Sequence, residues 1–83
     1  MQNLAIVPNP SSGLFTISFD VNQGKQIQIK IYDLVGQLVQ AEEPVMVSGS
    51  YTKQINLCNV AKVVYILQIQ SGDGILNRKI EVD

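Results

Sequence analysis

The chain has 83 residues, of which 46% are hydrophobic and 16% are charged, and its formal net charge is −1. This length allows one domain with one modest core, and the near-zero charge gives no electrostatic basis for binding nucleic acid or an anionic membrane surface. The chain has no histidine and a single cysteine, Cys58, which excludes an imidazole base, an internal disulfide and a histidine metal site. We therefore expect a protein that is not an enzyme and needs no cofactor.

Isoleucine and valine each occur ten times, whereas alanine occurs only three times. β-Branched side chains favour pleated strands over helices, so the composition predicts an all-β fold. No stretch approaches the roughly 18 consecutive apolar residues of a transmembrane span, and the N-terminus lacks the pattern of a secretory signal peptide. We expect a single domain over residues 1–83, with Met1 as a start residue added to a segment excised from a longer protein.

The first predicted strand covers residues 3–7 and is followed by a Pro-Asn-Pro-Ser-Ser-Gly turn at residues 8–13. Proline fixes φ at Pro10 and disfavours helix at Asn9, while Gly13 can adopt the positive φ that closes the loop. Residues 14–21 alternate between polar and apolar side chains, which predicts a half-buried strand. Its core-facing residues would be Phe15, Ile17, Phe19 and Val21.

Residues 26–32 show the strongest alternation in the chain and predict a second half-buried strand. In the turn that follows, at residues 33–36, the Asp33 carboxylate can accept the N–H of Val35, and Gly36 tolerates positive φ. We expect Leu34 and Val35, the two apolar residues at the tip of this turn, to tuck over the end of the core. Further turns are predicted at residues 23–25 and 48–50.

Weaker strands are predicted at residues 36–41, 45–47 and 51–57. Residues 63–69 begin with apolar side chains on both faces, which is typical of a central strand, with Tyr65, Leu67 and Ile69 on the core face. A hairpin turn at residues 71–74 leads to the last strand, residues 75–82. Strands that recur every 8–12 residues with turns between them predict an antiparallel β-sandwich of about seven strands.

The polar and reactive side chains do not predict a catalytic or metal-binding site. The acidic residues are scattered over turns and strand ends, and the oxygen ligands at residues 20–22 are too few for a recognised Ca²⁺ loop. Cys58 is expected to be a small buried hydrophobe. The tyrosines leave two alternatives open, a platform that binds sugars or packing with the hydroxyl at the rim; they are Tyr32, Tyr51 and Tyr65.

The C-terminal residues 78–83 alternate charged and apolar side chains, as in a short strand that ends the chain. A strand at a sheet edge offers unpaired N–H and C=O groups to a partner, but charged side chains normally discourage such pairing. A protected edge and a docking strand therefore both stay open. Exposed edges would also allow a homodimer formed through them, and the sequence leaves the oligomeric state open.

Several motifs occur in order along the chain: Pro8-Asn9-Pro10-x-x-Gly13, Ile29-x-Ile31-Tyr32-Asp33-x-x-Gly36-x-x-Val39, Gly49-x-Tyr51, Ile55-x-Leu57, Tyr65-Ile66-Leu67 and Lys79-Ile80. In this combination the chain resembles the C-terminal sorting domain of type IX secretion substrates, the Por secretion tail family, over nearly its whole length. Val63 departs from the pattern, because a small residue usually precedes the Val-Tyr pair, and this departure concerns only the local bend.

The resemblance implies a seven-stranded immunoglobulin-like β-sandwich at the C-terminus of a large secreted protein of a Gram-negative bacterium. A cargo protein, covalently linked on the N-terminal side, would reach the periplasm and then be exported by outer-membrane type IX components that recognise this folded domain. A sortase-like protease would remove the domain and leave the cargo on the cell surface or in the medium. The domain would have no catalytic role, and neither nucleic acid nor a small-molecule substrate is implied.

By the same resemblance, recognition by the translocon falls on the last strand, which comprises Arg78, Lys79, Ile80, Glu81, Val82 and Asp83. Other motif residues would shape the fold, namely Pro8, Asn9, Pro10, Gly13, Tyr32, Asp33, Gly36, Gly49 and Tyr65. The alternative is a carbohydrate-binding or adhesive β-sandwich module that tethers a secreted enzyme to its substrate.

Overall fold

The computed structural model describes residues 1–72 and 74–83 and is built from strands joined by short connections. The strands are β1 (Gln2–Val7), β2 (Leu14–Tyr32), β3 (Leu38–Ala41), β4 (Val45–Asn56), β5 (Val64–Ser71) and β6 (Gly74–Glu81). Every pair of neighbouring strands is antiparallel. The described residues contain no helix that is long and apolar enough to cross a membrane. The predicted all-β fold is confirmed.

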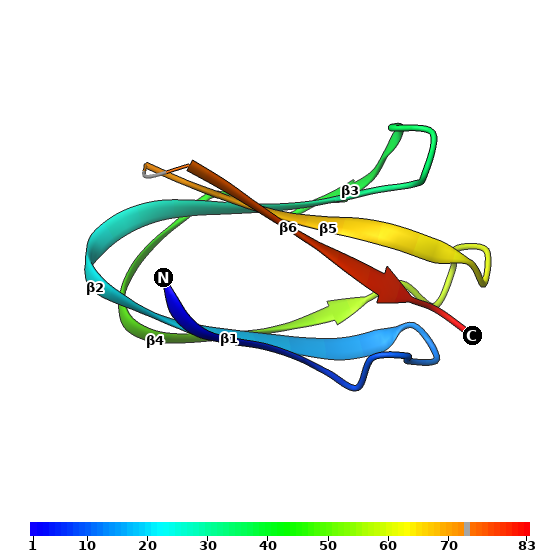
Figure 1. Cartoon of the computed structure of the whole chain (residues 1–83), viewed down its shortest axis with the longest axis horizontal. Coiled ribbons are helices and arrows are strands. Elements are labelled where there is room, and N and C mark those ends of the chain that lie inside the picture. Colours follow the sequence, from blue (N-terminus) through cyan, green and yellow to red (C-terminus); the bar gives the residue numbers. More distant parts are fainter. Residues whose placement is uncertain (73) are drawn as a thin grey trace.

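The sheet curls back over itself, so that two layers face each other across one core (Figure 1). In the first layer, the first half of β2 pairs with β1 and with residues 49–56 of β4. In the second layer, the second half of β2 pairs with residues 45–47 of β4, with β3 and with β5. Among the strands of the described residues, β6 pairs with β5 alone and forms an edge of the second layer. The β5–β6 hairpin is present as predicted, since pairing extends to Ser71 and Gly74; Asp73 lies outside the described residues.

Two predicted turns are bends within continuous strands. Pairing between β2 and β4 passes from Val21 and Gly49 to Lys25 and Val47, so residues 22–24 bulge opposite Ser48. Gly49 has a φ of 84°, which the absence of Cβ permits. Because the two bends lie side by side, both strands change direction at the same point and stay paired on either side of it. The described residues therefore form six strands, where the sequence pattern predicted about seven.

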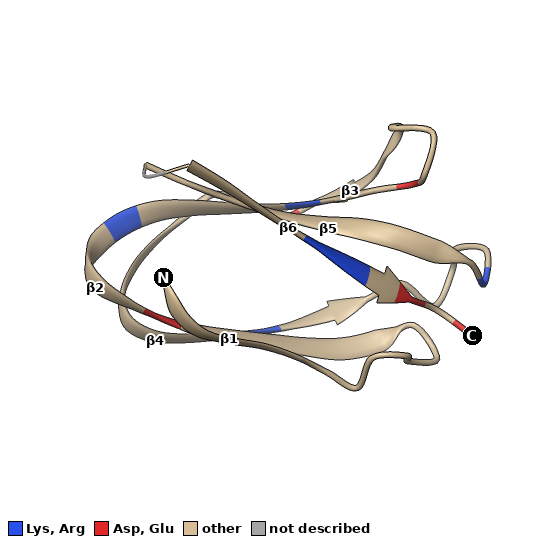
Figure 2. Ribbon diagram, in the orientation of Figure 1, with Lys and Arg blue, Asp and Glu red and all other residues tan. Residues whose placement is uncertain are grey.

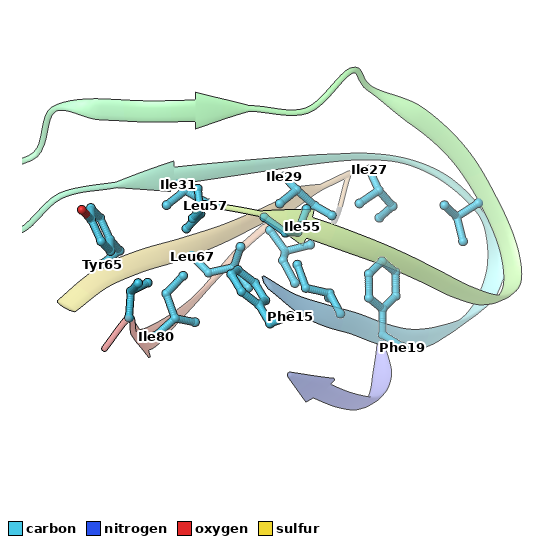
Figure 3. Packing of buried hydrophobic residues seen from close by; sticks show 14 of the residues in the cluster. Phe15, Phe19, Ile27, Ile29, Ile31, Ile55, Leu57, Tyr65, Leu67 and Ile80 are labelled. Carbon is cyan, nitrogen blue, oxygen red and sulfur yellow. The ribbon is translucent and has the colours of Figure 1, made fainter. Parts of the chain in front are cut away.

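The core consists of the alternating residues of both layers (Figure 3). The inward positions predicted for β2 and β5 are confirmed, including Phe15, Ile29 and Leu67, which are 2% exposed or less. Each fully buried aliphatic or aromatic side chain contributes about 1.5–3 kcal/mol of transfer free energy. The core residues are Phe15, Ile17, Phe19, Val21, Ile27, Ile29, Ile31, Val47, Ile55, Leu57, Tyr65, Leu67, Ile69, Ile80 and Val82.

The turn between β2 and β3 forms as predicted, but its tip does not. Asp33 Oδ1 accepts the N–H groups of Val35 at 3.1 Å and of Gln37 at 2.8 Å, and Gly36 has a φ of 90°. Leu34 and Val35 are nevertheless 66% and 83% exposed, so the expectation that they cover the end of the core is wrong. The hairpin instead projects away from its layer (Figure 1).

Cys58 is also placed differently from the sequence expectation, because its side chain is exposed. Leu57 occupies the last core position of this segment, and Cys58 begins the turn that follows, with its N–H donating to Asn56 Oδ1 at 2.9 Å. The core contact that follows is made by Val60, which is partly buried.

Candidate functional site

The last strand divides its side chains between the two faces of its layer. β6 pairs with β5 from Gly74 opposite Ser71 to Glu81 opposite Val64. Ile80 lies opposite the buried Tyr65, so Ile80 and Val82 point into the core, where each is 2% exposed. By alternation, Lys79 and Glu81 point to the outer face.

The six residues predicted to be recognised therefore form two groups. Arg78, Lys79, Glu81 and Asp83 are exposed near the end of the chain, where Figure 2 shows basic and acidic segments in succession on β6. Ile80 and Val82 are buried and can reach a partner only if the domain opens. In the folded domain these two residues anchor the strand, and the charged residues are available for contact.

The free edge of β6 is covered at this point by the side chain of Asn9. Its Nδ2 donates to the carbonyl oxygen of Lys79 at 3.1 Å, and its Oδ1 accepts the N–H of Glu81 at 3.0 Å. The amide group thus replaces one peptide unit of a neighbouring strand, because it supplies one donor and one acceptor in the correct order. The peptide bonds before Pro8 and Pro10, on either side of Asn9, are both cis.

Ser11 continues the same contact toward the C-terminus. Its N–H donates to the carbonyl oxygen of Glu81 at 2.9 Å, and its carbonyl oxygen accepts the N–H of Asp83 at 2.8 Å. Ser11 thereby forms an isolated parallel bridge with Val82, and only 4% of its surface is exposed. We use the term clamp for the contact of Asn9 and Ser11 with residues 79–83.

Gly13 fixes the loop that carries the clamp. Its φ is 114°, and its carbonyl oxygen accepts the N–H of Leu57 at 2.6 Å. A Cβ atom at this position would lie 3.0 Å from the Cα of Cys58, which is closer than side chains normally approach backbone atoms. Glycine is therefore required here both for its conformation and for the space it leaves.

Comparison with known families decides the identity of the chain. Residues 5–83 match the model of a family described as the secretion system C-terminal sorting domain. The chain belongs to this family. No curated protein matches the sequence. Sorting domains of this family are C-terminal signals for type IX secretion, which exports proteins to the cell surface or the extracellular space.

Arg78 lies on the free edge of β6, just before the clamp, at a strand position on the core side of the layer. Arg78 lies opposite the buried Leu67, yet its side chain is exposed, and its Nη1 donates to the carbonyl oxygen of Asn77 at 2.9 Å. The guanidinium group therefore stays at the edge of the layer and does not enter the core. Charges placed in this way discourage edge-to-edge association.

The three tyrosines of the sorting domain do not share a surface. Tyr65 is buried, and its hydroxyl donates to the carbonyl oxygen of Ala61 at 2.6 Å. Tyr51 packs against Phe19, with ring centroids 5.3 Å apart. Tyr32 is half-buried on the outer face of the layer that contains β5. This arrangement follows the packing alternative and does not form a common platform for a sugar.

On the layer that contains β1, the carboxylate of Asp20 connects neighbouring strands through two hydrogen bonds. It accepts hydrogen bonds from Asn3 Nδ2 and Ser50 Oγ, each at 2.8 Å, and these bonds lower its pKa below the ordinary value of 3.8. The carboxylate thereby links β1, β2 and β4. Within residues 1–72 and 74–83, no group of three acidic or cysteine side chains is arranged to hold a metal ion.

The sequence located the charged strand of the sorting domain but missed the clamp. Asn9 and Pro10 were expected to shape a turn, and Ser11 had no assigned role. The available signal was an asparagine between two prolines, a residue whose side chain readily mimics a peptide unit. What that side chain binds could not be read locally, since its partners lie 70 and 72 residues further along the chain.

Proposed function

We propose that outer-membrane type IX components of a Gram-negative bacterium recognise this domain in its folded form and export a cargo protein attached to its N-terminal side. The observation that carries this proposal is the family match over residues 5–83. The cargo passes through the periplasm, and a sortase-like protease then removes the domain, which leaves the cargo on the cell surface or in the medium. The domain itself is not an enzyme.

Within this function, the charged residues at the end of β6 are the part that the machinery reads. Arg78, Lys79, Glu81 and Asp83 are exposed, and the clamp holds their backbone in one position. A rigid set of charges binds with a smaller loss of conformational entropy than a flexible tail. Ile80 and Val82 support recognition indirectly, because their burial keeps the strand in place.

The curled sheet corresponds in this proposal to the immunoglobulin-like sandwich implied by the resemblance. β2 and β4 each contribute one segment to each side of the bend, so each counts as two strands in a description by layers. Counted in this way, the six continuous strands of the described residues give eight segments, one more than the seven strands of the implied sandwich.

The proposal is tested with a periplasm-directed reporter fused to residues 1–83 in a host that has the type IX apparatus. Wild-type fusion should place the reporter outside the cell, and a host without the apparatus should retain it. The double variant Arg78→Gln and Lys79→Gln should reduce export, whereas Lys25→Gln, at the bend in β2, should not. Substitution is a sharper test than deleting residues 78–83, because deletion would also remove two core residues.

Each fusion is checked for folding by circular dichroism and thermal melting before export is compared. A folded wild-type domain that leaves the reporter in the periplasm would overturn the proposed function. Export that is equal for wild type and the double variant would instead show that the terminal charges are not the signal.

A further inference from the structure

The free edges of β1, β3 and β6 are each interrupted, short or covered. The clamp covers β6 at residues 79–83, and just before it Arg78 donates to the carbonyl oxygen of Asn77. The pairing of β1 with β2 is interrupted by a bulge between Gln2 and Ala5. β3 has only four residues, and its pairing with β2 also shifts in register. Edges of these kinds are poor templates for an added strand.

The edge of β4 at residues 49–56 is long and regular by comparison. This segment pairs with residues 14–21 of β2 without a shift in register. Leu57 donates its N–H toward β2, to the carbonyl oxygen of Gly13, so by alternation the N–H and C=O groups of the even-numbered residues point away from β2. No strand of the described residues pairs with that side. The even-numbered residues are all exposed, and they are Ser50, Thr52, Gln54 and Asn56.

The side chains of this edge give it little protection. Its even-numbered residues are uncharged, and its one charged residue, Lys53, occupies an inward position between Tyr51 and the buried Ile55. An inward charge at an edge normally opposes an added strand. Here the ammonium group of Lys53 lies 3.5 Å from the carboxylate of Glu42 in the second layer, so its charge is already compensated. The backbone groups of the edge therefore stay available to a partner.

A recess lies beside this edge, on the side that faces the connection from β3 to β4. Its volume is about 420 Å³, and it is lined by Tyr51 from the edge and by Pro44 and Val45 from the connection. Side chains of an added strand would alternate between the outer face and this recess. In strand addition, backbone hydrogen bonds give affinity, and pockets for alternate side chains give specificity. The edge and the recess together have both parts.

The charges around the recess balance. Lys53 is paired with Glu42, Glu43 is the next residue, and Lys30 lies opposite Ala41, which also lines the recess. Two positive and two negative side chains select neither a basic nor an acidic group. The ring of Tyr51 and the aliphatic surface of Pro44 and Val45 instead suit an aliphatic or aromatic side chain.

A second copy of the chain fits this edge poorly. A two-fold antiparallel pairing that uses all the outward residues places Ser50 opposite Asn56 and Thr52 opposite Gln54. Lys53 would then lie opposite its own counterpart, and like charges directly opposite each other destabilise a pair of strands. A segment attached before β1 is also badly placed, because β1 and β4 flank the first half of β2 on opposite sides. The edge is therefore suited to a strand from another protein.

We propose that residues 49–56 of β4 accept an extended segment of a protein of the export machinery as an added strand, with an aliphatic or aromatic side chain of that segment in the recess. This inference rests on the proposed function. It gives the machinery a second contact, in the first layer, whereas the charged residues of β6 lie in the second layer.

The test uses the reporter fusion with Thr52→Pro. Proline removes an N–H that points away from β2, and edge strands accept proline at such positions. Export should fall about tenfold, because the added strand loses a backbone hydrogen bond and meets the proline ring. The matched control is Ile75→Pro on the edge of β6, whose N–H points away from β5 by the same alternation as that of Glu81. Its export should equal that of wild type.

A second variant leaves every backbone N–H in place. Thr52→Lys together with Gln54→Lys puts charges on the edge and should lower export about three- to tenfold. Thermal melting is measured for each variant. The double lysine variant decides the comparison if Thr52→Pro melts more than about 2 °C below wild type.

Amide hydrogen exchange of the purified wild-type domain detects the added strand directly. In the free domain, Thr52 and Gln54 should exchange at least about tenfold faster than Lys53 and Ile55, whose N–H groups point toward β2. Outer membranes from a host with the type IX apparatus should slow exchange at Thr52 and Gln54. Membranes from a host without the apparatus should leave it unchanged.

The outcomes separate the two proposals. A wild-type fusion that is not exported overturns the proposed function and this inference with it. Normal export of folded edge variants, or no protection of Thr52 and Gln54 by the membranes, overturns the inference alone. Sedimentation velocity is the last measurement, since a wild-type dimer that Thr52→Pro dissociates would assign the edge to a second copy and would also overturn the inference.

Discussion

Asn9 closes the edge of β6 at Glu81, a residue 72 positions further along the chain, by accepting its N–H at 3.0 Å. The same side-chain amide donates to the carbonyl oxygen of Lys79. The loop that follows the first strand therefore holds the last strand, and the charged residues of β6 depend for their position on residues near the N-terminus.

Replacing Asn9 by alanine should destabilise the domain by about 1–2 kcal/mol, because two backbone groups of β6 lose their partners. Urea unfolding measures this change, and amide hydrogen exchange at Glu81 should become about tenfold faster. Asn59→Ala, in the exposed turn after β4, is the control and should alter stability by less than about 0.5 kcal/mol. Unchanged exchange at Glu81 in the Asn9 variant would contradict the clamp.

Replacing Gly13 by alanine should cost about 3 kcal/mol, from the positive φ and from the 3.0 Å approach of the new Cβ to Cys58. This is a large part of the total stability of a domain of this size, for which about 4–12 kcal/mol is typical. Gly24→Ala is the matched control, since nothing lies within 4 Å of a Cβ there. Similar melting temperatures for the two variants would show that Gly13 is not constrained.

Asp20 should make the domain sensitive to acid. Its pKa is lowered in the folded state by hydrogen bonds from Asn3 and then Ser50, so its stabilising effect is complete above the ordinary value of 3.8 and is lost as pH falls through the lower, folded-state value. Asp20→Asn should remove this part of the pH dependence in thermal melts. Replacing both donors, as Asn3→Ala and Ser50→Ala, should have the same effect, and a pH profile unchanged by either would contradict the assignment.

Arg78→Val should promote self-association through β6. The new side chain would lie opposite the buried Leu67 and remove the charge that separates this edge from another strand. Sedimentation velocity should show dimers that increase with concentration, whereas Arg78→Gln, which keeps a polar side chain at the edge, should stay monomeric. An Arg78→Val variant that stays monomeric would show that the clamp alone protects the edge.

The core and the strand faces could be predicted because alternation is a local property. Ile27, Ile29 and Ile31 are buried together because successive side chains of a strand point to opposite faces. The bends at residues 22–24 and 48–50 could not be distinguished from turns. Glycine favours both, and only the pairing of Val21 with Gly49 places the two bends side by side.

Exposed apolar residues were the second source of error. Leu34, Val35 and Cys58 were assigned to the core from hydrophobicity alone, but Leu34 and Val35 lie at the tip of a projecting hairpin and Cys58 is exposed in the turn after β4. In the candidate site, too, only features that are local in the sequence could be predicted. The charged strand was found from its own sequence, whereas the clamp of Asn9 and Ser11 depends on contacts between the two ends of the chain.

The continuity of β2 and β4 through both layers means that neither layer can open alone. Separating one from the other would require breaking the ladder between these two strands, which runs from Leu14 and Asn56 through the bend to Ile27 and Val45. The domain should therefore melt as one cooperative unit. Since its Cα trace measures 36 × 23 × 17 Å, a pore narrower than this body must widen, or else the entire domain must unravel before it can be threaded.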